Sequence, residues 1–96
     1  MAMTAAEKRA FRTALGSKKH ADIIIAIIDS GSATAVADAT EKALAVAMGN
    51  KSLSANVITA LETGSALSAA AKTSLANIIG KKRLADSIIT QINAIT

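Results

Sequence analysis

The sequence contains no cysteine, proline, tryptophan or tyrosine, and only one phenylalanine and one histidine. The lack of cysteine excludes a disulfide scaffold, a thiolate metal site and a cysteine nucleophile. A single histidine excludes a multi-histidine metal site. A single aromatic residue excludes a stacking platform for single-stranded nucleic acid. We therefore expect neither a metal nor an organic cofactor.

The 96 residues are instead rich in small and aliphatic side chains, with 51% apolar residues and 19% charged residues. Alanine and isoleucine dominate the apolar set. A chain this short can bury one small core, and its high apolar content argues against disorder. The sequence therefore predicts a single ordered domain over residues 1–96.

No long hydrophobic run is present. The longest aliphatic stretch, Ile23 to Ile28, has six residues, whereas about 20 are needed to span a bilayer. The segment Met1 to Arg12 lacks the apolar region of a secretory signal. We expect a protein that is made and assembled in a cytoplasm and has no membrane partner.

Three segments of the chain resemble one another. Gly16–Asp29, Gly49–Glu62 and Gly80–Asn93 align at offsets of 33 and 31 residues. The match continues upstream, because Phe11, Leu44 and Leu75 share one position of the repeat. These offsets divide the chain into units of approximately 4–31, 34–64 and 67–96, each of about 31–33 residues.

Each unit has the pattern of two short helices. Apolar residues recur at helical spacing, Thr4 and Glu7 form a capping-box pattern, and a glycine follows each of the first five apolar runs. The predicted fold is all-α, with six short helices arranged as three tandem helical hairpins. The helices are expected near residues 5–15, 18–30, 35–48, 51–63, 69–79 and 82–94. The pattern leaves open whether the hairpins stack or close into a bundle.

The second helix of the first unit is apolar over most of its circumference. Ile24 and Ile28 belong to the stripe shared by all units, whereas Ile23 and Ile27 widen it. A helix with such a wide apolar face is buried on more than one side. We predict that Ile23, Ile24, Ile27 and Ile28 form an interaction face toward another subunit or a partner; the alternative is a central helix of the monomer.

Basic residues form two clusters, and the formal net charge is +4. The predicted basic patch consists of Lys8, Arg9, Arg12, Lys18, Lys19, Lys81, Lys82 and Arg83. Such patches are typical of phosphate or acidic-protein binding. Lys18 and Lys82 share one repeat position, at a helix start, where a cation opposes the helix dipole. We expect this lysine to lie beside the last carbonyls of the preceding helix; contact with a phosphate or an acidic partner is the alternative.

Candidate catalytic groups are few. His20 and Asp22 point about 200° apart on a helix and cannot pair directly. His20 also occupies the repeat position of Leu53 and Leu84, which indicates a partly buried packing role. The seven carboxylates form no acid–base motif, and no phosphate-binding loop is present. We predict no catalytic residues and no enzyme activity.

The phrase Gly-x-Lys-x-x-Ala-Asp-x-Ile-Ile-x-x-Ile occurs at Gly16–Ile28 and again at Gly80–Ile92. It resembles helical segments of small virion proteins of tailed bacteriophages, namely capsid decoration and head-fibre proteins. The resemblance implies a structural role in the virion: docking on the major capsid protein or another virion protein, as a homo-oligomer and without catalysis. The resemblance does not assign a function to any individual residue of this sequence.

These observations favour a structural virion protein that binds the capsid or head fibres through apolar helix faces. Two alternatives remain. One is a small basic nucleic-acid-binding protein that uses Lys8, Arg9, Arg12, Lys18 and Lys19, which is possible but not favoured. The other is an adaptor that engages a host protein.

Overall fold

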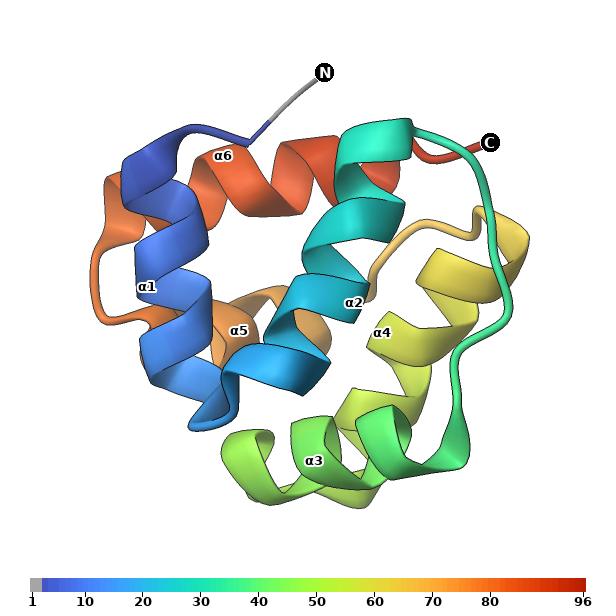
Figure 1. The fold of residues 1–96 in the computed structure, drawn as a ribbon, viewed down its shortest axis with the longest axis horizontal. Helices are drawn as coiled ribbons and strands as arrows, with labels where there is room; N and C mark the ends of the chain where they lie inside the picture. Colours follow the sequence, from blue (N-terminus) through green and yellow to red (C-terminus); the bar gives the residue numbers. More distant parts are fainter. Residues whose placement is uncertain (1–2) are drawn as a thin grey trace.

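Six α-helices make up the computed structural model, which describes residues 3–96 (Figure 1). In chain order they are α1 (Ala5–Leu15), α2 (Lys18–Ser30), α3 (Asp38–Met48), α4 (Lys51–Thr63), α5 (Ala69–Ile79) and α6 (Lys82–Asn93). Residues 3–96 contain no strand, so the all-α prediction is confirmed. Each helix contacts its neighbour within the same repeat unit.

The helix ends follow local sequence signals. Thr4 and Glu7 form the expected capping box at the start of α1. Gly16 ends α1 with a φ of 76°, and its N–H donates to the Arg12 carbonyl. This left-handed conformation is accessible to glycine without the Cβ clash that other residues incur. The other four glycines also have positive φ values and follow α2 to α5.

The third helix begins three residues later than expected, at Asp38 instead of residue 35. Two backbone N–H groups of the preceding segment bind to α4: Thr34 donates to the Leu61 carbonyl, and Val36 donates to the Glu62 carboxylate. These long-range bonds hold the segment against α4 in a non-helical conformation, and sequence periodicity does not report them.

One hydrogen bond recurs in all three units and supports the repeat. A backbone N–H just before the first helix of the unit donates to a side-chain oxygen near the end of the second helix. The pairs are Met3 to Asp29 at 2.6 Å, Val36 to Glu62 at 3.0 Å and Leu67 to Asn93 at 3.0 Å. Met3, Val36 and Leu67 are all buried. The bond therefore anchors the start of each unit to its own end.

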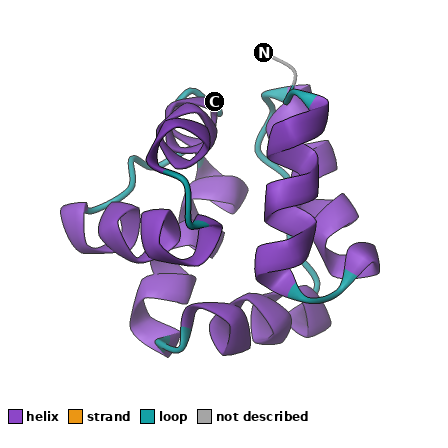
Figure 2. Ribbon diagram, turned by 90° about the vertical axis from the view of Figure 1, so that its left-hand side faces the viewer, coloured by secondary structure: helices purple, strands orange, loops and turns teal. Residues whose placement is uncertain are grey.

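The three units close into a bundle instead of stacking in an open row. Helix α1 contacts α6, as α3 contacts α2 and α5 contacts α4. The first helices of the units all contact one another, and so do the second helices. Each type of contact thus occurs three times around an approximate threefold axis, and the molecule measures 27 × 27 × 26 Å. Figure 2 shows the helices crossing around a common centre.

The core lies at this centre. Equivalent residues of the three units contribute equally, since Phe11, Leu44 and Leu75 are all fully buried. The two ends of the described chain lie on either side of the end of α2 (Figure 1). Met3 is bound to Asp29, and the Thr96 N–H donates to the Gly31 carbonyl.

Candidate interaction surfaces

The tight turns inside the three hairpins carry a concentration of positive charge. These turns, residues 16–19, 49–52 and 80–83, contain no carboxylate. Their basic residues are Lys18, Lys19, Lys51, Lys81, Lys82 and Arg83, all exposed. The three turns lie on the same side of the molecule, at the left of the view in Figure 1. We call the six basic side chains of these turns the basic turn surface.

Two of these six cations are paired within their own helices. Lys18 lies 3.0 Å from Asp22, and Lys82 lies 2.8 Å from Asp86, both at i,i+4 spacing. The Asp86 carboxylate raises the pKa of Lys82. These pairs correct the expectation that this lysine contacts the preceding helix's carbonyls. The remaining four cations of the surface form no ion pair within residues 3–96.

Two members of the predicted basic patch lie elsewhere and are engaged inside the first hairpin. The Arg12 Nε atom lies 2.7 Å from the Asp22 carboxylate, and Lys8 Nζ lies 3.4 Å from Asp29. Hydrogen bonds from Arg12 and Lys18 lower the pKa of Asp22. The predicted patch is therefore not one continuous surface. Lys8 and Arg12 join α1 to α2, and Arg9 is exposed on α1.

Carboxylates gather at the opposite end of the hairpins. Five of the seven lie in the first turns of α1 and α3 or the last turns of α2 and α4: Glu7, Asp29, Asp38, Glu41 and Glu62. The other two, Asp22 and Asp86, are the partners of the turn lysines. The same hairpin ends also carry Lys8, Lys42 and Lys72, so the charge there is mixed, whereas the turns are basic.

The predicted isoleucine face is mostly internal, and this prediction needs correction. Ile24, Ile27 and Ile28 are 0%, 5% and 1% exposed, whereas Ile23 is 37% exposed. Helix α2 contacts α1, α3, α4 and α6, so the chain itself covers most of the helix circumference. Only Ile23 remains available to a partner.

Sequence reasoning missed one exposed hydrophobic residue, Val46, which is 77% exposed on α3. The repeat contained a signal for it, because the equivalent positions hold the polar residues Thr13 and Asn77. Val46 and Ile23 are the two large hydrophobic residues exposed within residues 3–96.

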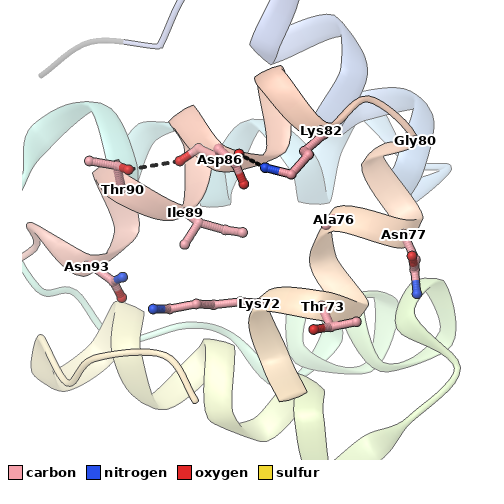
Figure 3. A pocket seen from close by; sticks show the side chains of 10 residues that line it. All are labelled: Lys72, Thr73, Ala76, Asn77, Gly80, Lys82, Asp86, Ile89, Thr90 and Asn93. Atoms are coloured by element: carbon pink, nitrogen blue, oxygen red, sulfur yellow. Dashed lines mark hydrogen bonds and ion pairs between the residues drawn. The ribbon is translucent and has the colours of Figure 1, made fainter. Parts of the chain in front are cut away.

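Grooves run between the helices of the second and third hairpins. The groove of α5 and α6 is lined by Lys72, Thr73, Ala76, Asn77, Gly80, Lys82, Asp86, Ile89, Thr90 and Asn93 (Figure 3). The groove of α3 and α4 uses largely equivalent positions, with Ala45 where the third unit has Ala76. Arg12 holds this position in the first unit and reaches across to Asp22. The first hairpin therefore fills with its own side chain a space that the other two leave open.

His20 is half-buried, and its Nδ1 atom is buried without a hydrogen-bond partner. Within residues 3–96, no three histidine, aspartate or glutamate side chains gather as a metal site would require. None of the helices in that range has the length and apolar character to cross a bilayer. Comparison of the chain with protein-family models, curated proteins and solved structures gives no match.

Proposed function

We propose that the chain is a non-enzymatic structural virion protein of a tailed bacteriophage, and that it docks through the basic turn surface on an acidic face of the major capsid protein or another virion protein. The phage context comes from the resemblance of the repeated Gly-x-Lys-x-x-Ala-Asp phrase to small virion proteins. The docking mode comes from the distribution of charge.

One observation carries the docking mode: six exposed cations share one side of the molecule, and the turns that present them contain no carboxylate. Lys19, Lys51, Lys81 and Arg83 form no ion pair within the described chain, so they are free to meet a partner's carboxylates. Exposed charges of this kind steer association and determine its specificity.

Burial of the isoleucine face argues against docking through a broad apolar surface. An interface that uses Ile24, Ile27 and Ile28 would require α2 to leave the core. Charged docking leaves the three hairpins intact, because every member of the basic turn surface is already exposed.

The proposal is tested on particles produced by a host that carries the gene. The wild-type chain is expected in purified particles at a fixed ratio to the major capsid protein. A triple variant, K19E/K81E/R83E, should fold normally but be lost from the particles. The matched control K42E/K72E/R9E reverses the same amount of charge outside the basic turn surface and should be retained.

Nucleic-acid binding uses the same cations and is the competing outcome. It predicts an affinity for double-stranded DNA that falls steeply with salt. Salt-dependent DNA binding that K19E/K81E/R83E abolishes, together with absence of the chain from particles, would replace the virion proposal with this alternative.

A further inference from the structure

The α5–α6 groove is open where the first hairpin holds a side chain of its own. Ala76 occupies the repeat position of Arg12, and the groove has a volume of about 830 Å³. We infer that it binds an extended segment of a partner protein that presents an arginine and, close to it, a carboxylate. Of the basic turn surface only Lys82 lines this groove, no ligand contact is assigned to it, and the inference does not rest on the proposed function.

The first hairpin shows how such a groove is filled. Arg12 reaches from α1 to α2, where its Nε atom lies 2.7 Å from Oδ1 of Asp22. The other oxygen of the same carboxylate accepts a hydrogen bond from Lys18 at 3.0 Å. One aspartate thus binds two cations on separate oxygens, one from its own helix and one from across the groove.

In the third hairpin only half of this arrangement is present. Asp86 holds the repeat position of Asp22, and its Oδ2 atom accepts a hydrogen bond from Lys82 at 2.8 Å. Within residues 3–96 no side chain donates to its Oδ1 atom, because Ala76 stands where an arginine would reach it. The Asp86 side chain is 56% exposed, whereas that of Asp22 is 37% exposed. An arginine from a partner can therefore take the place of the missing one.

The other end of the groove offers hydrogen-bond donors. In the first hairpin Lys8 Nζ lies 3.4 Å from the Asp29 carboxylate. The equivalent residues of the third hairpin are Lys72 and Asn93, and Figure 3 shows Lys72 extended toward Asn93. Oδ1 of Asn93 already accepts from the Leu67 N–H, and its Nδ2 group can only donate. Lys72 forms no ion pair within the described chain. These two donors lack the carboxylate that the first hairpin supplies, so they suit an anionic group of the ligand.

The groove is thus complementary to a ligand that carries a cation at one end and a carboxylate at the other. Asp86 and Asn93 are seven residues apart on α6, about 10 Å along the helix. The buried Ile89 lines the groove between them. An extended segment places the side chains of residues i and i+2 on the same face, about 7 Å apart. An arginine and a glutamate at this spacing reach both ends, because their long side chains span the remainder.

The second hairpin provides an internal comparison. It also has an alanine, Ala45, at the position of Arg12. However, Ala55 stands at the position of Asp22 and Asp86, so no carboxylate is present there to accept a guanidinium. The inference therefore predicts binding to the groove of the third hairpin and not to that of the second.

The experiment is an NMR titration of the nitrogen-15-labelled full chain with the peptide acetyl-Ala-Arg-Ala-Glu-Ala-amide. We expect saturable shifts of the backbone signals of Ala76 and Asp86, with a dissociation constant in the millimolar range. One control peptide carries citrulline in place of arginine, which keeps the shape and removes the charge; another carries glutamine in place of glutamate. Each should bind about fivefold more weakly, as expected for the loss of one exposed ion pair. Absence of shifts at tens of millimolar peptide, or equal affinity for the citrulline peptide, overturns the inference.

Variants of the chain then locate the ligand. Ala76→Arg fills the groove with an arginine of its own and should abolish binding, although it removes no charged group. Asp86→Asn should weaken binding of the arginine peptide about fivefold and leave the affinity for the citrulline peptide unchanged. The matched control Ala45→Arg makes the same change in the second hairpin and should leave the dissociation constant unchanged. Binding that survives Ala76→Arg, or that Asp86→Asn does not weaken, overturns the inference.

Discussion

The Nε2 atom of Gln91 lies 3.3 Å from the Glu7 carboxylate, and 84 residues separate the two side chains in sequence. Glu7 is 2% exposed and Gln91 is 5% exposed. The contact joins α6 to α1 and closes the ring of three units. The equivalent positions hold Thr40 with Ile27 and Ala71 with Ala60. A polar pair therefore distinguishes the closing interface from the other two.

Glu7 should make stability depend on pH. Burial raises the pKa of Glu7, but hydrogen bonds from Ser87, Thr4 and Gln91 together outweigh it and hold the pKa below its ordinary value of 4.5. A carboxyl group with a lowered folded pKa contributes stability that is present above the unfolded pKa and is lost as the pH falls through the folded pKa. Urea unfolding from pH 7 down to pH 3 should show this loss. Glu7→Gln should flatten the acid limb; a slope equal to that of the wild-type chain would contradict the assignment.

Gly64 should tolerate a side chain less well than Gly49. Both have positive φ values, 76° and 69°, but a Cβ on Gly64 would lie 2.8 Å from the Ile95 carbonyl oxygen, and a Cβ on Gly49 would meet nothing within 4 Å. Gly49→Ala should cost about 1–2 kcal/mol for the backbone conformation alone. Gly64→Ala should cost about 1 kcal/mol more, since the C-terminal segment must move. Thermal unfolding of the two variants measures the difference, and equal losses would contradict the close approach.

Ala76→Arg should reproduce in the third hairpin the ion pair of the first. Ala76 and Asp86 line the same groove and hold the repeat positions of Arg12 and Asp22 (Figure 3). An exposed pair of this kind contributes about 0.5 kcal/mol. A double-mutant cycle with Asp86→Asn, followed by urea unfolding, separates the pair from other effects of arginine. If Ala76→Arg raises the free energy of unfolding equally in the Asp86→Asn background, the ion pair does not form.

A circular permutant should fold. The ends of the described chain are bound near one another, Met3 to Asp29 and Thr96 to Gly31. A direct join of residue 96 to residue 1 would place seven residues between α6 and α1, the same number as between α2 and α3. New ends between Thr34 and Ala35 should preserve the far-UV circular dichroism and a cooperative thermal transition. New ends between Val57 and Ile58, inside α4, should abolish both; loss of folding in the first permutant would contradict the closed arrangement.

The helices and their ends could be predicted from sequence because they depend on nearby residues. The capping box of Thr4 and the N-cap hydrogen bonds of Asn50 and Ser68 all form within three positions of the cap. Ser17 is the N-cap residue of α2, but its side chain makes no capping hydrogen bond. The predicted start of α3, at residue 35, was also wrong, because hydrogen bonds to Leu61 and Glu62 hold the preceding segment against α4.

The same reasoning from sequence predicted only part of the candidate interaction surfaces. The repeat alignment identified the turn lysines, because their place beside a glycine is local. It did not show that Lys8 and Arg12 are engaged with Asp29 and Asp22. Those pairs require α1 and α2 to lie antiparallel at a particular separation, which residue spacing along one helix does not specify.

The sequence by itself determined that the chain is helical, that it has three equivalent units and that α2 has an unusually wide apolar face. Only the tertiary structure decided what covers that face. The periodicity of apolar residues indicates which side of a helix is buried. It does not indicate whether the residues that bury this side belong to the same chain or to another. Closure of the ring, through contacts such as Glu7 with Gln91, surrounds α2 with four helices. It buries Ile27 and leaves Ile23 at the surface.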